Sequence, residues 1–166
     1  MAPASSFDVS STVDLQEVDN AVNQARKEVA QRYDFKGSAA AIEFNKAENT
    51  LTLVADNNMK MDALWEILQT RLVRRNVPVK NLKLGDLEQA GNNTIRRVVT
   101  LQQGIPSEAA RDIIKFIKEQ NLKKVQTAIQ GDQLRISSPS KDELQSAMGL
   151  LRGHDFGIAL QFGNYR

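Results

Sequence analysis

Residues 14–54, DLQEVDNAVNQARKEVAQRYDFKGSAAAIEFNKAENTLTLV, hold the pattern that decides the fold. Asp14 followed by Glu17 three residues later is typical of a capping box at the start of a helix. Apolar residues then recur at spacings of three and four as far as Arg32, which is one face of an amphipathic helix. Apolar and polar residues alternate over 41–45 and 50–54 on either side of a polar turn. The stretch therefore predicts a helix followed by a β-hairpin.

This helix–hairpin unit is flanked by further elements, and the order then repeats. A strand at 7–10 precedes it, and a helix capped by Asn57 or Asn58 and a strand over 82–87 follow it. The second half repeats the order with strands at 94–101, 125–129, 134–136 and 158–165 and with helices beginning at Pro106 and Ser140. Each half reads strand, helix, hairpin, helix, strand, although the two halves share little sequence.

The repeated order predicts an α+β chain of two tandem ferredoxin-like, RNP-like (βαββαβ) domains. Each would have a four-stranded antiparallel sheet with two helices on one face. The turn Gly91-Asn92-Asn93 is the best boundary candidate, which gives domains at 1–90 and 91–166. Residues 1–6 are small and polar, and we expect them to be disordered.

The composition excludes several classes of function. The 166 residues carry a net charge of +2 without long blocks of like charge, which does not favour binding of duplex DNA by bulk electrostatics. Without cysteine, and with His154 as the sole histidine, thiolate and multi-histidine metal sites are excluded, and we expect neither a metal nor a catalytic residue. No apolar run is long enough for a membrane span and no signal pattern opens the chain, so the expected location is the cytoplasm.

The stretch that follows the first helix, Arg32-Tyr33-Asp34-Phe35-Lys36-Gly37-Ser38, has an unusual composition for a connector. Rings can stack on a base, cations can meet phosphate, and a carboxylate can accept from guanine donors. These features suit a nucleotide. The alternative from the same residues is structural: Tyr33 and Phe35 anchor the loop to the core, and Asp34 pairs with Arg32 or Lys36.

A second stretch of similar kind follows the last helix. Arg152-Gly153-His154-Asp155-Phe156-Gly157 again combines a base, an acid, an aromatic residue and glycines, and the chain ends Leu160-Gln161-Phe162-Gly163-Asn164-Tyr165-Arg166. An inserted last strand would order Arg166 and let it contact a ligand. The alternative assigns Phe162 to the core and Arg166 to solvent, and we expect His154 to be a capping or surface residue.

These motifs resemble the bacterial YajQ family. The resemblance rests on Asp14–Ala21, on Gln31–Ser38, on Gln130–Gln133 and on Leu150–Gly157 with the final seven residues, and it covers nearly the whole chain. It implies tandem ferredoxin-like domains that can exchange their last strands, so that 158–165 would complete the first sheet and bring Arg166 towards Arg32–Ser38. It also implies nucleotide binding, with cyclic di-GMP as the ligand of some members, which act on transcription through a protein partner.

The sequence thus favours a non-enzymatic nucleotide receptor, for cyclic di-GMP or another purine nucleotide, that acts through a transcription regulator. The expected binding residues are Arg32, Tyr33, Asp34, Phe35, Lys36, Arg152, Asp155, Phe156, Gln161 and Arg166. A competing hypothesis is an RNA-binding protein that uses the crevice between the domains. The two differ in the ligand that binds and in the salt dependence of binding.

Overall fold

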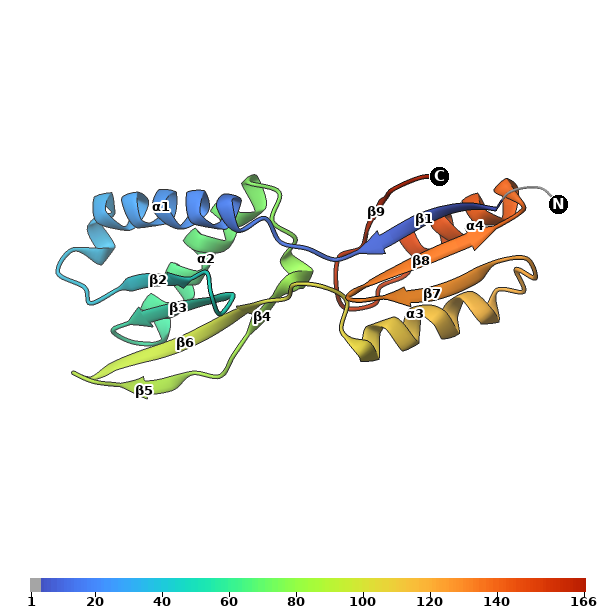
Figure 1. Ribbon diagram of the computed structural model, residues 1–166. Coiled ribbons are helices and arrows are strands. Elements are labelled where there is room, and N and C mark those ends of the chain that lie inside the picture. The colour runs from blue at the N-terminus through green and yellow to red at the C-terminus, as the bar shows by residue number, and fades with distance from the viewer. Residues whose placement is uncertain (1–3) are drawn as a thin grey trace. The chain divides into compact units, whose positions relative to one another are not determined.

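The structure is a computed structural model that describes residues 4–166. The chain divides into two compact units, each with its own sheet and helices. The first unit comprises residues 13–102, and the second comprises residues 4–12 together with 103–166. Figure 1 traces the chain from the second unit into the first along blue residues and back along yellow ones.

The elements follow the order that the sequence predicts, except that the predicted strand over 82–87 is shorter and a further short strand, which was not predicted, comes before residue 91. The helices are α1 (Leu15–Gln31), α2 (Asn58–Arg74), α3 (Ser107–Glu119) and α4 (Lys141–Arg152), with short 3-10 helices η1 (Tyr33–Phe35) and η2 (Val79–Asn81). The strands are β1 (Ser5–Ser10), β2 (Ala41–Asn45), β3 (Thr50–Ala55), β4 (Leu82–Leu84), β5 (Glu88–Ala90), β6 (Thr94–Leu101), β7 (Gln126–Gln130), β8 (Gln133–Ser138) and β9 (Gln161–Gly163).

Helix starts are fixed by the side chains that the sequence pattern singles out. The Asp14 carboxylate accepts from the backbone N–H groups of Gln16 and Glu17 at the start of α1. The Asn57 side chain accepts from the N–H of Lys60 at the start of α2, and Ser140 accepts from the N–H of Glu143 in α4. Each cap satisfies donors that a helix leaves unpaired in its first turn.

The first unit has an antiparallel sheet in the order β2-β3-β6-β4, and β5 also pairs with β6. Helices α1 and α2 pack on one face, and between them and the sheet lies a core that includes Leu51, Leu53, Leu64, Leu68 and Val99. This is the predicted ferredoxin-like arrangement, with β6 in the central position next to β3.

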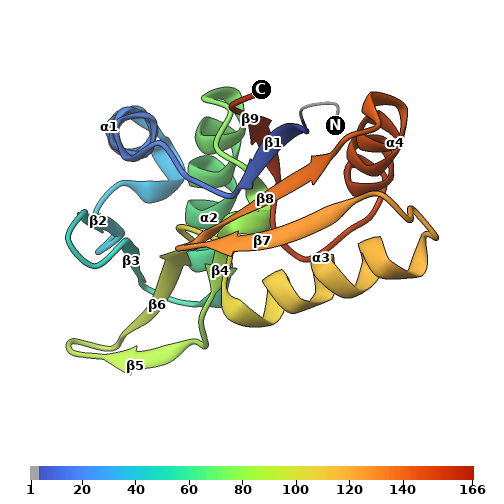
Figure 2. The same cartoon turned by 45° about the vertical axis from the view of Figure 1, so that its right-hand side comes forward.

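The second unit repeats this arrangement with its own elements. Its antiparallel sheet has the order β7-β8-β1-β9, and Figures 1 and 2 both show α3 running beside β7. Phe7 and Val9 of β1 are fully buried with Ile113, Leu134 and Ile136. The fold class of two ferredoxin-like units is therefore confirmed.

The boundaries of the units differ from the predicted 1–90 and 91–166. Strand β6 belongs to the sheet of the first unit, and β1 belongs to the sheet of the second, so the turn at Gly91 is the turn between β5 and β6. The two halves of the chain have thus exchanged β1 and β6. Alternation of polar and apolar residues shows which face of a strand is buried but not which sheet the strand joins, and both strands alternate alike.

The predicted exchange of the last strand also differs from the structure. Strand β9 pairs with β1, in the sheet that β7 and β8 build, and does not complete the sheet of the first unit. The backbone of Arg166 continues this pairing, because Arg166 and Ser6 exchange two hydrogen bonds of 3.0 and 3.1 Å. Ser5 and Ser6 are thus part of β1 and not of a disordered terminus, and residues 1–3 lie outside the described residues.

Candidate functional site

The Arg32–Ser38 loop begins where α1 ends and turns tightly towards β2. The N–H of Arg32 donates to the carbonyls of Glu28 and Val29, and η1 follows at once. Gly37 has a φ of +74°, a backbone conformation that side chains disfavour, and the N–H of Ser38 donates back to the Phe35 carbonyl at 3.0 Å. The glycine therefore lets the loop reverse within a few residues.

Arg32 and Asp34 form a two-pronged ion pair within this loop. Arg32 Nε lies 2.9 Å from Asp34 Oδ1, and Arg32 Nη2 lies 2.7 Å from Asp34 Oδ2. The hydrogen bonds from Arg32 lower the pKa of Asp34, and those to Asp34 raise the pKa of Arg32. Both carboxylate oxygens of Asp34 are therefore engaged by its neighbour, as in the structural alternative that the sequence left open.

The two aromatic side chains of the loop have opposite environments. Phe35 is 5% exposed and belongs to the core of the first unit, with Arg32 Cζ 5.4 Å and Lys60 Nζ 5.1 Å from its ring centroid. Tyr33 is 89% exposed. Phe35 thus anchors the loop, and Tyr33 presents its ring to solvent.

Asp56 and Lys60 tie the loop to the start of α2. The Ser38 hydroxyl and the Ala39 N–H donate to the Asp56 carboxylate, and these bonds, that of Ser38 first, lower the pKa of Asp56. The Lys60 ammonium donates to the backbone carbonyl of Asp34. Sequence reasoning missed both residues, because they follow the loop by about twenty positions and carry no motif of their own.

A depression of about 640 Å³ lies beside the loop, between the end of α1 and β2. Its lining is partly apolar, and Arg26, Lys36 and Glu43 contribute charged groups. Arg26 is already engaged, because its Nε and Nη2 donate to the Ile42 carbonyl at 3.0 and 2.5 Å. Lys36 and Glu43 are exposed and so are available to a ligand in the depression.

The predicted residues of the C-terminal stretch lie in the second unit. Arg152 places its guanidinium 5.1 Å from the ring centroid of Phe162 in β9. Phe156 is half-buried and packs with Phe116 of α3 and with His154, at ring centroid distances of 5.5 and 4.5 Å. The rings of His154 and Phe156 therefore hold the segment after α4 against α3.

The other three predicted residues of this stretch are engaged with the backbone. Asp155 accepts from the N–H of Gly157 at 2.9 Å, which forms a local turn. The side-chain amide of Gln161 accepts a hydrogen bond from the N–H of Thr12 at 2.9 Å and donates one to the Thr12 carbonyl at 3.0 Å. These two bonds join β9 to the segment after β1. Arg166 pairs with Ser6 through its main chain, and its side chain is exposed.

The structure therefore places five predicted residues in each unit. Arg32, Asp34 and Phe35 contact one another in the first unit, and Tyr33 and Lys36 project from the same loop. The residues from Arg152 onward make separate contacts within the second unit.

Comparison with known proteins identifies the family of the chain. A family model described as "Nucleotide-binding protein YajQ-like" matches residues 5–166. The chain belongs to this family. It is 50% identical to a nucleotide-binding protein of Bdellovibrio bacteriovorus, over 97% of this chain and 98% of that protein. It is 48% identical to nucleotide-binding proteins of Solibacter usitatus and Synechococcus elongatus, over 99% and 100% of this chain and 98% and 100% of theirs.

Membership of the YajQ-like family agrees with the resemblance of the Arg32–Ser38 and C-terminal motifs, since the match includes both. In residues 4–166, no helix combines the length and apolar character that crossing a membrane requires.

Proposed function

We propose that the chain is a non-catalytic receptor for a guanine nucleotide, with cyclic di-GMP as the ligand, and that it acts in the cytoplasm. The observation that carries the proposal is the Arg32–Ser38 loop, which is held firmly, exposes Tyr33 to solvent and places Lys36 in the lining of a partly apolar depression. The printed names of its relatives, which are nucleotide-binding proteins, support the same class of ligand.

Within this loop the proposal divides the residues into contacting and positioning groups. Tyr33 stacks on the base, because its ring is almost fully exposed, and Lys36 neutralises a phosphate. Arg32, Asp34 and Phe35 position these two, since their charged groups and ring are already satisfied within the protein. A fixed loop loses little conformational entropy when a ligand binds.

Guanine is favoured over adenine by the acid in the depression. Glu43 lines the depression together with Lys36. Its carboxylate can accept hydrogen bonds from the N1–H and N2–H groups of guanine, and adenine has no donors at these two positions. Asp34 is a poorer acceptor than the sequence indicated, because Arg32 occupies both of its oxygens.

The C-terminal residues Arg152, Asp155, Phe156, Gln161 and Arg166 are part of the proposal as a separate group in the second unit. Arg152 and Arg166 have exposed side chains and can contact phosphate. Asp155, Phe156 and Gln161 support the backbone around them, so their substitution would act through the fold.

Isothermal titration of the full chain with cyclic di-GMP, GTP and ATP tests the proposal. We expect the wild-type chain to bind cyclic di-GMP. Lys36→Ala should weaken the affinity roughly tenfold, because it removes a charged contact. Lys46→Ala should leave the affinity unchanged, because Lys46 is an exposed lysine outside the depression. Absence of heat and of a thermal shift with all three nucleotides would remove the proposal. Equal affinity for ATP would remove the choice of guanine. Arg152→Ala in the same titration tests the C-terminal group.

Single-stranded RNA serves as the competing ligand in the same assay. RNA binding through phosphates would weaken steeply as salt is raised, whereas a small nucleotide held by few contacts would show a shallow dependence.

We further propose a transcription regulator as the protein partner. The ligand can change that complex only if it binds two states of the protein with different affinity, so a complex of equal strength with and without cyclic di-GMP would contradict this step.

A further inference from the structure

A line of charged side chains of alternating sign leads from the Arg32–Ser38 loop to the last turn of α2. Beyond its ion pair with Asp34, Arg32 places Nη1 4.0 Å from Oε2 of Glu28, which precedes it in α1. Glu28 Oε1 in turn accepts two hydrogen bonds from Arg71, at 3.1 Å from Nε and 2.9 Å from Nη2. The order along the line is therefore Asp34, Arg32, Glu28 and Arg71.

Glu28 is held more closely by Arg71 than by Arg32. Both bonds from Arg71 have ordinary hydrogen-bond lengths, whereas the 4.0 Å to Arg32 is too long for a hydrogen bond. Side chains four residues apart at the end of a helix lie on the same face, and an acid that precedes a cation is the favourable order. Glu28 is thus a second acceptor within reach of Arg32, and Arg71 restrains it.

A closer approach of Glu28 would act against the Arg32–Asp34 pair. It would divide one guanidinium between two carboxylates and draw it towards α1, and it would also bring a like charge nearer to Asp34. Other charges around the pair come from α2, where Glu66 attracts Arg32 and Lys60 attracts Asp34. The restraint on Glu28 therefore favours the clasp that the structure shows.

The Arg32–Asp34 pair closes around Tyr33, which lies between the two in the sequence. Tyr33 is the first residue of the short helix η1, and the ion pair joins the side chains on either side of it. Its own ring is 89% exposed and has little packing to hold it. The ion pair is therefore a main restraint on the backbone that carries this ring.

We propose that Glu28 and Arg71 are positioning residues for Tyr33, because Arg71 restrains Glu28 and so leaves Arg32 on Asp34. Both lie outside the lining of the depression beside the loop, so they act without touching the ligand. The effect on nucleotide binding rests on the proposed function. The effect on Asp34 rests on the ion pairs alone and is measured without a nucleotide.

The pKa of Asp34, followed by carboxyl ¹³C NMR of the full chain, tests the restraint. The hydrogen bond from Arg32 is the first cause that lowers this pKa in the wild-type chain. We expect Arg71→Met to raise the pKa, because the released Glu28 competes with Asp34 for Arg32. Glu28→Gln alone should leave it nearly unchanged, since Arg71 already restrains Glu28. Added to Arg71→Met, the same substitution should lower it again. Asp34→Asn assigns the signal.

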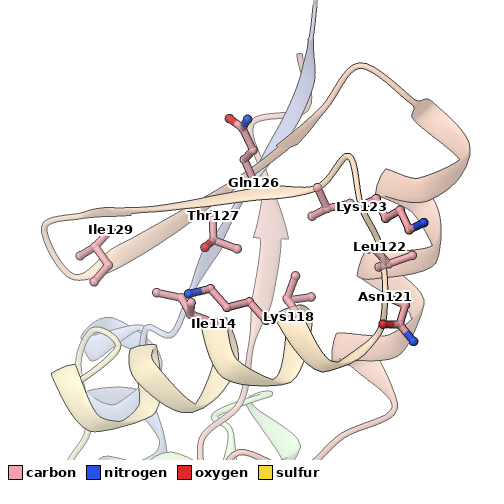
Figure 3. Close-up of a pocket in the computed structure, with 10 residues that line it drawn as sticks. Ile114, Lys118, Asn121, Leu122, Lys123, Gln126, Thr127 and Ile129 are labelled. Carbon is pink, nitrogen blue, oxygen red and sulfur yellow. The ribbon is translucent and has the colours of Figure 1, made fainter.

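The comparison of the two backgrounds separates restraint from the general effect of charge. If only long-range charge mattered, Glu28→Gln would lower the pKa of Asp34 equally with and without Arg71, and that result would overturn the proposal. The matched control for loss of a cation is Lys118→Met in the second unit. Figure 3 shows Lys118 on α3 beside a groove of about 790 Å³, whose lining contains no acidic residue. Lys118→Met should leave the pKa of Asp34 unchanged.

Titration of the same variants with cyclic di-GMP measures the consequence for binding. We expect Arg71→Met to weaken the affinity about threefold, the scale of a partly exposed ion pair. Glu28→Gln alone should not change the affinity, and the double variant should restore it, which a merely structural role of Arg71 would not produce. Far-UV circular dichroism checks that each variant is folded.

The two measurements distinguish failure of this role from failure of the proposed function. If the wild-type chain binds nucleotide and Arg71→Met binds it equally well, the positioning role is overturned and the proposed function stands. If the wild-type chain binds no nucleotide, the role in binding falls together with the proposed function, and the NMR comparison decides the ion-pair restraint by itself.

Discussion

Asp8 in β1 accepts a hydrogen bond of 3.0 Å from Nε of Arg135 in β8, although the two are 127 positions apart in the sequence. Asn164 donates to the other carboxylate oxygen at 2.8 Å, and the side chain of Asp8 is almost fully buried. Arg135 first, and then Asn164, lower the pKa of Asp8. This carboxylate therefore joins three segments of the sheet in the second unit and helps to fix which sheet β1 enters.

We expect Asp8→Ala to lower the free energy of unfolding of the second unit by about 2 kcal/mol, because two charge-assisted hydrogen bonds are lost and their donors are left unpaired. Urea unfolding followed by far-UV circular dichroism measures the change. Asp112→Ala, an exposed residue of α3, is the control and should change the stability by less than about 0.5 kcal/mol. Equal effects of the two substitutions would mean that the Asp8 pair contributes no more than a surface charge.

The neighbours Phe35 and Tyr33 should respond oppositely to truncation. Phe35→Ala removes a core ring that two cations contact, and we expect it to lower the stability of the first unit by about 3 kcal/mol or more. Tyr33→Ala should leave stability within about 0.5 kcal/mol and weaken nucleotide binding roughly tenfold. The fluorescence of Trp65 in α2, the one tryptophan of the sequence, reports on unfolding of this unit. A Tyr33 variant with unchanged affinity would rule out stacking on this ring.

The stability of the first unit should fall in acid. The pKa of Asp56 lies below its ordinary value of 3.8 in the folded protein, mainly because Ser38 donates to it. A group with a lowered folded pKa contributes stability that is complete above its unfolded pKa and is lost as the pH falls through the folded value. We therefore expect stability to be flat above about pH 5 and to decrease below about pH 4. Asp56→Asn should reduce that decrease, and urea titrations from pH 3 to 7 with Trp65 fluorescence provide the measurement.

Gly104 should tolerate alanine far less well than Gly149 does. Gly104 has a φ of +83°, its N–H donates to the Ser11 carbonyl, and an added Cβ would lie 2.7 Å from Cβ of Asp132. We expect Gly104→Ala to cost about 1–3 kcal/mol. Gly149 is exposed in the interior of α4 with open space around it, so Gly149→Ala should stabilise by about 1 kcal/mol. Thermal melts of both variants compare them, and a similar loss in each would show that the strained backbone at Gly104 is not limiting.

Local patterns predicted the elements well because their causes are local. The caps at Asp14, Asn57 and Ser140 act within one helical turn, and the alternation of β2 and β3 reflects a single buried face. The final strand was predicted over 158–165, and β9 is shorter, although the main chain of Arg166 still pairs with that of Ser6.

The candidate site was only partly predictable. The sequence singled out the Arg32–Ser38 loop, but the partners that hold it, Asp56 and Lys60, come from the start of α2. Whether Phe35 or Tyr33 faces solvent was also open, because two aromatics two residues apart in a short 3-10 turn have no periodicity that separates them.

The sequence by itself determined the kind and order of the elements, the repeat of the ferredoxin-like pattern and the family, because propensity, capping and hydrophobic period act over a few neighbouring residues. The tertiary structure decided that β1 and β6 exchange sheets and that Phe35 is core while Tyr33 is surface. Those outcomes depend on contacts such as Asp8 with Arg135 and Phe35 with Lys60, whose partners are far apart in the chain and meet only once it has folded.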